Sequence, residues 1–165
     1  MVKNTSKPQI WHKIIRKLNE AQLDYVIVGA AALVIHGLPR STLDIDVYIP
    51  ARGDTLTGVF TIAKALGLKS EQEAILKVSH LPKLFAGQWI CFSYKGQDVL
   101  DVFFEDEGAF NKLYRNAELK TDKDISVRVA SLDDLVGMKQ ASGRPIDKAD
   151  LCLIEEARKI IKGKK

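Results

Sequence analysis

Residues 25–49, YVIVGAAALVIHGLPRSTLDIDVYI, contain the pattern from which the rest of the fold can be inferred. An apolar strand, YVIV, leads through a glycine into a short apolar helix, and a polar turn then precedes a second strand, DIDVYI. Because successive side chains of a strand point to opposite faces, Asp44, Asp46 and Tyr48 share one face, and the residues between them take the other. The sequence therefore places two carboxylates together on a strand that is otherwise apolar.

Asp44 and Asp46 are about 7 Å apart along such a strand, so their carboxylates can converge on one point. At that range they repel each other unless a cation lies between them. Ligation by oxygen alone suits Mg²⁺ or Mn²⁺. The alternative is that Asp44 caps the turn and Asp46 faces solvent on an edge strand, and the pair by itself leaves both interpretations open.

The residues around this pair favour the metal site. Gly29 lies between the first strand and the helix, where the free amides that begin with Ala30 suit a phosphate group, although a plain strand-to-helix turn is the alternative. Arg40 and Thr42 directly precede the two acids. Arg40 either binds a phosphate, fixes one of the two aspartates, or is a solvated loop arginine.

A later strand at 97–104, QDVLDVFF, offers a third acid. Asp101 is flanked by Leu100 and Val102, and an acid in so apolar a strand needs a partner or a metal. Asp98 lies nearer the preceding turn and is expected to face the other way, so we prefer Asp101. Three carboxylates from two neighbouring strands, beside a turn that accepts phosphate, are typical of a two-metal phosphoryl-transfer site.

The whole pattern predicts an α+β fold, with a mixed central β-sheet, flanking helices and two C-terminal helices that close the structure. A single domain is expected over 1–165, with its core at about 25–104 and a C-terminal helical part at about 131–162. Helices are expected at 8–21, 30–36, 54–67, 107–115, 131–142 and 145–161. Strands are expected at 25–28, 44–49, 74–79, 88–94, 97–104 and 126–130, with a hairpin turn at 94–97.

The composition, 46% hydrophobic and 28% charged over 165 residues, is that of an ordinary globular protein. No apolar run approaches the roughly 18–20 residues of a membrane span, and MVKNTSKPQIWHKII lacks the apolar core of a signal peptide, so we expect a cytoplasmic location and no membrane partner. The net charge of +4 permits an anionic partner without demanding one. Cys91 and Cys152 lack metal-like spacing and are expected to be reduced and partly buried.

Taken together, VGAAALVIHGLPRSTLDIDVYI and VLDVFF resemble the nucleotidyltransferase superfamily that includes DNA polymerase β. The hallmark of that superfamily is a glycine-containing strand–helix turn, a DxD strand and a third acid on a later strand. HGLPRSTLDIDVYI and ASLDDLVGMKQASGRPIDKADL are similar, more narrowly, to small stand-alone prokaryotic members near the AbiEii-type toxins. The resemblance covers about residues 25–160 and implies the nucleotidyltransferase fold.

The resemblance also implies roles for individual residues. Asp44, Asp46 and Asp101 would ligate the Mg²⁺ or Mn²⁺ ions, and Asp101 would help to deprotonate the acceptor hydroxyl. Gly29 would cradle the β- and γ-phosphates of a nucleoside triphosphate (NTP), and Lys139 would contact the nucleotide phosphates. The full set of expected nucleotide-binding residues is Gly29, Ala30, Arg40, Thr42 and Lys139.

The matching C-terminal segment contains Arg144, Asp147 and Asp150. The two aspartates are three residues apart and share a helix face. They either form a buried brace with Arg144 or Lys139 or touch the substrate, and the sequence leaves both open. His36, in the HG turn, is interpreted as structural, packing the end of the short helix.

The expected function is metal-dependent transfer of a nucleoside monophosphate from an NTP to an acceptor hydroxyl on an RNA or tRNA end, a protein or a small molecule. The alternative is a non-catalytic nucleotide-binding module or one component of a toxin–antitoxin pair with a protein partner. Ala30 stands where the family usually has serine or glycine. Alanine keeps the backbone amide but removes a hydroxyl that could hold a phosphate oxygen, so the departure bears on the affinity for the triphosphate.

Overall fold

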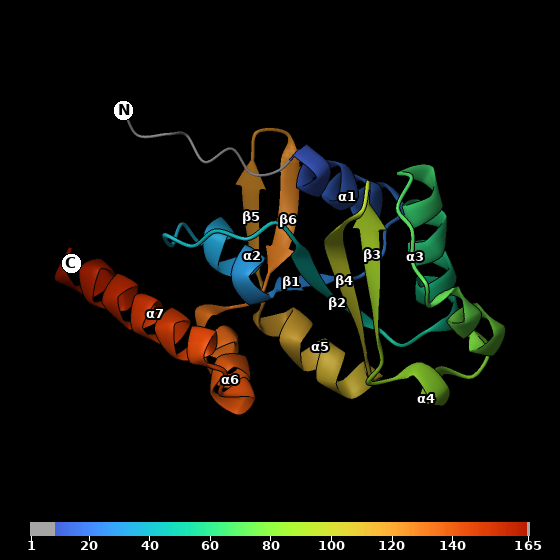
Figure 1. Ribbon diagram of the computed structural model, residues 1–165. Helices are drawn as coiled ribbons and strands as arrows, with labels where there is room; N and C mark the ends of the chain where they lie inside the picture. The colour runs from blue at the N-terminus through green and yellow to red at the C-terminus, as the bar shows by residue number, and fades with distance from the viewer. Residues whose placement is uncertain (1–8, 165) are drawn as a thin grey trace.

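The computed structural model of the protein describes residues 9–164 (Figure 1). The expected start of the first helix at residue 8 lies outside these residues. The helices are α1 (Gln9–Glu20), α2 (Gly29–Ile35), α3 (Gly53–Ala65), the 3₁₀ helix η1 (Glu73–Val78), α4 (Pro82–Phe85), α5 (Glu107–Asn116), α6 (Leu132–Ser142) and α7 (Pro145–Gly163). The strands are β1 (Val26–Val28), β2 (Ile45–Pro50), β3 (Trp89–Tyr94), β4 (Gln97–Glu105), β5 (Glu118–Asp122) and β6 (Ile125–Val129).

The described strands form one six-stranded mixed sheet in the order β3-β4-β2-β1-β6-β5. β2 pairs in parallel with β4 and antiparallel with β1, and β1 pairs in parallel with β6. Two antiparallel hairpins, β3–β4 and β5–β6, form the ends of the sheet. The predicted α+β class with a mixed sheet is confirmed, and β2 lies inside the sheet rather than at its edge.

Apolar side chains from α1 and α3 pack against one face of β2 and β4. Ile14 of α1 and Ile62 of α3 surround the same small space as Val47 and Leu100 of the two strands. Each fully buried side chain of this size stabilises the fold by roughly 1.5–3 kcal/mol. The opposite face of the same strands carries the acids.

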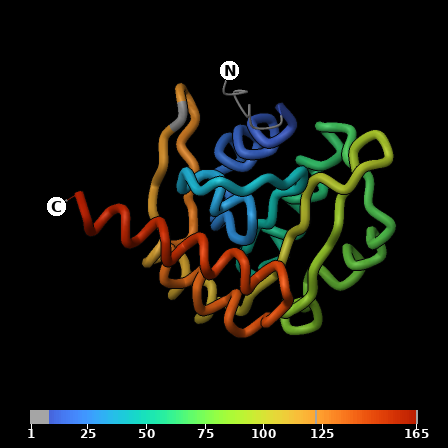
Figure 2. Tube along the Cα trace, turned by 60° about the vertical axis from the view of Figure 1, so that its left-hand side comes forward, coloured from blue at the N-terminus to red at the C-terminus, as the bar shows by residue number. Residues whose placement is uncertain are grey.

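The C-terminal helices α6 and α7 lie side by side (Figure 2). Ser131 caps α6 by accepting a hydrogen bond from the amide of Asp134, and Gly143 ends it with φ = 64°, a left-handed conformation that glycine adopts without strain. Pro145 begins α7, where its missing amide hydrogen costs nothing. The two predicted C-terminal helices and their boundary are confirmed.

Residues 74–79 do not form the predicted strand. This segment is the 3₁₀ helix η1, and it contains no buried residue. The edge of β3, where a further strand would pair, is occupied instead by a side chain: the Gln72 amide donates to the Trp89 carbonyl at 2.9 Å and accepts from the Cys91 amide at 2.9 Å. Because Gln72 fills the hydrogen-bonding positions of Trp89 and Cys91, residues 74–79 do not pair with this edge as a strand.

The structure also contains two elements that the sequence pattern does not predict. β5 is largely exposed and polar, ELKTD, and α4 spans only four residues. Both cysteines are free, and Cys91 is half-buried, but Cys152 is exposed on α7, which corrects the expectation for that residue. None of the described helices combines the length and the apolar character that crossing a membrane demands.

Candidate active site

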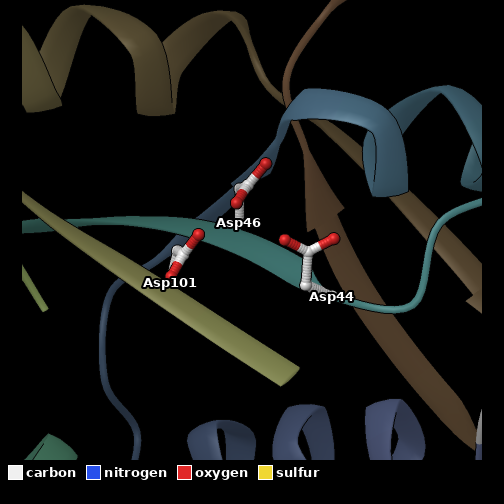
Figure 3. A group of neighbouring side chains, drawn as sticks. All are labelled: Asp44, Asp46 and Asp101. Carbon is white, nitrogen blue, oxygen red and sulfur yellow. The ribbon is translucent and has the colours of Figure 1, made fainter. Parts of the chain in front are cut away.

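Asp44, Asp46 and Asp101 converge because β2 and β4 are parallel neighbours. Asp46 of β2 lies directly opposite Asp101 of β4, and Asp44 immediately precedes β2. One carboxylate oxygen from each residue lies within 4.8 Å of the others. Figure 3 shows Asp46 and Asp101 pointing to the side of the sheet on which α2 lies, away from α1.

Neighbouring side chains orient two of these carboxylates. The Thr42 hydroxyl donates a 2.6 Å hydrogen bond to Oδ1 of Asp44. The Cys91 thiol, directly across the β3–β4 ladder, donates to the carboxylate of Asp101. Burial and this hydrogen bond raise the pKa of Cys91 to about 12, so the thiol keeps its proton and acts as a donor. The structure thus gives Thr42 a direct contact with a candidate metal ligand.

Gly29 packs directly against the carboxylate of Asp46. A Cβ atom at this position would lie 2.2 Å from Oδ2 of Asp46, and the backbone has φ = +66°, which disfavours any residue with a side chain. No side chain caps the N-terminus of α2, so its first backbone amides are not used by a cap. The turn that begins at Gly29 and Ala30 therefore borders the carboxylates.

Asp46 and Asp101 resist ionisation more than an ordinary aspartate does. Burial, with added repulsion from Asp44 and Asp101, raises the pKa of Asp46 to about 7. The pKa of Asp101 is also raised, chiefly by burial, with the Cys91 hydrogen bond opposing the shift and Asp44 adding to it. Positive charge placed among them would reverse both effects, so the site favours a bound cation.

The geometry and the donor chemistry both fit a small divalent ion. All three ligands are carboxylate oxygens, which Mg²⁺ and Mn²⁺ prefer over nitrogen or sulphur. Adjacent and opposite oxygens of an octahedral Mg²⁺ shell are about 3.0 and 4.2 Å apart, and one oxygen from each aspartate lies within 4.8 Å of the others.

A second charged cluster, from α6 and α7, lies beside the carboxylates. Lys139 is buried and donates to Asp150 at 2.7 Å, and its Nζ is 3.5 Å from Asp147. Arg144 donates to Asp147 at 2.8 Å and holds the pKa of that carboxyl well below its usual range. Arg40, from the loop before β2, donates to Asp150 at 2.8 Å. We call these five residues the charged brace.

The brace decides between interpretations that the sequence left open. Asp147 and Asp150 are 1% exposed and bind the cations of the brace. Arg40 is paired with Asp150 rather than with the aspartates of β2. Lys139 and Arg144 still act on the carboxylates at longer range, since their charges lower the pKa of Asp46. His36 has a structural contact, a 2.8 Å hydrogen bond from its ring nitrogen to the carbonyl of Ala130.

Asp98 does not face away from the site, contrary to the expectation from simple alternation. Cys91 pairs with Asp101 and Ser93 pairs with Asp98, so the two aspartates oppose residues on the same face of β3. An irregularity in the ladder between Phe92 and Ser93 inserts one extra residue into β4, which resets the alternation. The charge of Asp98, like that of Asp101, acts on the Cys91 thiol and helps to raise its pKa. Val99 and Leu100 are both buried although they are neighbours in a strand, and two adjacent apolar residues of this kind are the sequence signal of the bulge.

A row of aromatic rings follows the row of acids on the same face, and sequence reasoning did not find it. Tyr48 lies opposite Phe103, and Phe103 lies opposite Trp89, each two residues beyond the acid row. The Phe103 ring centroid is 5.1 Å from that of Tyr48 and 6.2 Å from that of Trp89. Trp89 is 49% exposed at the end of the row.

A family model and several solved structures are similar to this chain. The family model described as a nucleotidyltransferase of unknown function (DUF6036) matches residues 10–158. None of the curated proteins matches the chain significantly.

Several solved structures share the fold. A candidate nucleotidyltransferase (TM1012) from Thermotoga maritima has a TM-score of 0.57 and 15% identity, over 94% of this chain and 92% of its own. ANT(2")-Ia, solved in complex with adenylyl-2"-tobramycin, has a TM-score of 0.61 and 14% identity. The match covers 93% of this chain and 90% of the ANT(2")-Ia chain. An antigenic nucleotidyltransferase-like protein from Paracoccidioides brasiliensis has a TM-score of 0.54 and 18% identity, over 91% and 76%.

Proposed function

Because the chain belongs to the DUF6036 family of nucleotidyltransferases, we propose that it transfers a nucleoside monophosphate from an NTP to an acceptor hydroxyl. The observation that carries the proposal is the convergence of Asp44, Asp46 and Asp101 within 4.8 Å, beside a turn with uncapped helix amides. In this proposal the three aspartates hold Mg²⁺ or Mn²⁺. When bound, the ion would neutralise charge on the phosphate oxygens and on the attacking oxygen.

The remaining chemistry belongs to side chains and amides of this chain. The acceptor oxygen attacks the α-phosphorus, the bond from that phosphorus to the bridging oxygen breaks, and pyrophosphate leaves with the electron pair. Asp101, which lies directly opposite Asp46 in the sheet, takes the hydroxyl proton. The amides of the turn at Gly29 and Ala30 bind the departing phosphates, as backbone donors at a helix start do.

Thr42 and the charged brace act by positioning. Thr42 holds the carboxylate of Asp44 through its 2.6 Å hydrogen bond. The brace fixes the loop before β2 to α6 and α7, because Asp150 accepts from both Arg40 and Lys139. The positive charges of Lys139 and Arg144 favour the ionised form of Asp46.

A second candidate, a module that binds a nucleotide without turnover, is favoured by two observations. Ala30 offers no hydroxyl to a phosphate oxygen. Lys139 is 6% exposed and is already engaged by two carboxylates, so it reaches a phosphate only if it leaves that arrangement. Binding of an NTP with Mg²⁺ and no release of pyrophosphate would support this candidate over transfer.

The decisive experiment measures transfer and pyrophosphate release together. The protein is incubated with Mg²⁺, each α-labelled NTP in turn, and separate pools of RNA, protein and small-molecule acceptors. We expect label on one pool and stoichiometric pyrophosphate. Asp44→Asn, Asp46→Asn and Asp101→Asn are each expected to lower the rate by about 100-fold or more, since each loses roughly 3 kcal/mol of transition-state stabilisation.

Glu73→Gln is the matched control, because it removes an exposed carboxylate on η1, outside the site. Its rate is expected to equal that of the natural protein. Transfer that survives intact in the three aspartate variants would refute the assigned site. Absence of transfer with every NTP, together with tight binding of one of them, would replace the proposal with the binding module.

A further inference from the structure

A groove of about 790 Å³ lies along β3, and its lining includes residues 69–72, Trp89, Cys91, Ser93 and Asp98. Cys91 lies directly opposite Asp101 in the β3–β4 ladder, so the groove begins beside the third candidate metal ligand. The turn at Gly29 lies on the other side of the carboxylates, against Asp46. If the phosphates of the NTP bind at that turn, an acceptor approaches the carboxylates from the β3 side.

The backbone edge of β3 is not available to a peptide strand. The side-chain amide of Gln72 already pairs with the carbonyl of Trp89 and the amide of Cys91. Lys69 and Ser93 form a further pair of backbone hydrogen bonds, at 2.9 and 2.8 Å. The groove therefore binds through its side chains, and addition of a strand from another chain is not its mode of recognition.

The side chains of the groove offer a flat ring and hydrogen-bond acceptors. The Trp89 ring stacks on Phe103 at an interplanar angle of 25° and is 49% exposed, so it presents aromatic surface to a ligand. Asp98, brought to this face by the bulge, is exposed and supplies a carboxylate close to Asp101. Such a combination suits a ligand with several N–H or O–H donors and one flat face.

The charges around the groove select against anions. Its lining contains Glu71 and Asp98 against a single cation, Lys69, and the candidate metal ligands lie next to it. The cations of the charged brace are each already engaged by Asp147 or Asp150. A nucleic-acid end, which brings several phosphates, finds little compensating charge among these residues, whereas a neutral or cationic molecule does not need it.

We propose that this groove is the acceptor subsite, and that the acceptor is a small hydroxyl-bearing molecule, neutral or cationic, held by Asp98 and stacked on Trp89. The inference rests on the proposed function. The acceptor hydroxyl then lies beside Asp101, which receives its proton as the oxygen bonds to the α-phosphorus and pyrophosphate departs. Asp98 binds the acceptor and takes no part in the proton transfer.

The chain has two tryptophans, and their indole N–H signals in a ¹⁵N–¹H NMR spectrum separate the two proposals. Trp89 lines the groove. Trp11 is buried and donates to the carbonyl of Leu43, the residue before Asp44, so its signal reports on the metal site. Trp89→Phe assigns the signals by removing one of them.

The probes are glucosamine, N-acetylglucosamine and glucosamine 6-phosphate, which differ in charge, and a single-stranded hexamer of adenosine ribonucleotides. We expect glucosamine to shift the Trp89 signal with a Kd about threefold or more below that of N-acetylglucosamine, as one exposed charge contact allows. The phosphorylated sugar is expected to bind most weakly of the three. Asp98→Asn should make the Kd of glucosamine similar to that of N-acetylglucosamine, and Glu73→Gln should leave both Kd values unchanged.

The proposal is overturned if the RNA hexamer shifts Trp89 at lower concentrations than every sugar, if no sugar shifts it at all, or if Asp98→Asn leaves the glucosamine preference intact. Failure of the proposed function has a different signature. In that case Mg²⁺ with an NTP leaves the Trp11 signal unmoved and no pyrophosphate is released, whatever the sugars do at Trp89.

Discussion

Gly29 leaves room for the carboxylate of Asp46. The Asp46 carboxylate occupies the space in which a side chain at position 29 would lie, because Oδ2 is only 2.2 Å from the point that a Cβ atom would take. The glycine therefore has two roles: it allows the left-handed turn into α2, and it leaves space for a candidate metal ligand. Position 29 controls the orientation of Asp46 without any functional group of its own.

Gly29→Ala is expected to displace the Asp46 carboxylate and to strain the turn. A residue other than glycine with positive φ costs roughly 1 kcal/mol or more, and the contact with Asp46 adds to that cost. We expect Mg²⁺ affinity to fall by at least about tenfold, in the range found when partners of a metal ligand are lost. Isothermal titration with Mn²⁺ measures the affinity, and unaltered binding would show that the contact is relieved elsewhere.

Asp46→Asn is expected to stabilise the metal-free protein near neutral pH. The pKa of Asp46 is raised to about 7 by burial and by Asp44 and Asp101, against about 3.9 in an unfolded chain. The ionised form therefore destabilises the fold, beginning above pH 4 and fully above pH 7.

Because Asp46 is partly exposed, solvent screening reduces this destabilisation to about 1–2 kcal/mol. The Tm of Asp46→Asn should exceed that of the natural protein by about 3–6 °C at pH 8. The gain should vanish near pH 4, where the aspartate is protonated in the folded state. Glu73→Gln is the control for a general charge effect, and an equal gain at both pH values would contradict the assignment to Asp46.

At the scale of elements, the charged brace fixes α6 and α7 to the loop that carries Arg40. Asp150 accepts from Arg40 at 2.8 Å and from Lys139 at 2.7 Å, while remaining 1% exposed. Removing one member of such a buried network leaves its partners without compensation, which costs more than the original ion pairs stabilise. The brace is therefore expected to be sensitive to the loss of its buried members, Lys139, Asp147 and Asp150.

Asp150→Ala is expected to destabilise the protein by about 3–5 kcal/mol, because Lys139 stays buried with one partner fewer. Asp133→Ala removes an ion pair from the same two helices, between Asp133 and Arg158, but Asp133 has a side chain 90% exposed. Its loss should cost no more than about 1 kcal/mol. Denaturant unfolding of the two variants gives both values, and similar costs would mean that the brace contributes little.

At the scale of the whole molecule, the candidate site joins segments that are distant in the chain. The β1–α2 turn, β2 and β4 meet at the carboxylates, and α6 and α7 adjoin them. A ligand bound there contacts only the folded arrangement, so it stabilises the entire fold by mass action. Thermal unfolding therefore reports on occupancy of the site.

Mn²⁺ or Mg²⁺ at 100 times its Kd is expected to stabilise the protein by about 2.7 kcal/mol, and excess EDTA should reverse the effect. The shift should be larger at pH 8 than at pH 6, because Asp46, with its pKa near 7, must lose a proton to bind the ion. Asp44→Asn and Asp101→Asn should abolish most of the shift. A shift that is equal at both pH values and survives in these variants would place the metal elsewhere.

Local sequence was enough to predict the features that depend on neighbours along the chain. Strict alternation predicted that Asp44 and Asp46 lie close together, and one carboxylate oxygen from each lies within 4.8 Å of the other. The capping preferences of Ser131 and Gly143 set the limits of α6. These features hold because a strand period and a helix cap involve only a few consecutive residues, whose conformations are limited by local sterics and hydrogen bonds.

The meeting of distant groups, in contrast, was visible only in the folded molecule. Asp98 joined the face of Asp101 through a bulge that depends on pairing with β3, and Gln72 took the edge of that strand in place of the predicted one. Arg40 found its partner, Asp150, 110 residues away. Strand register and ion pairing of this kind depend on which of all the partners available in space binds best. A local sequence pattern does not specify those partners.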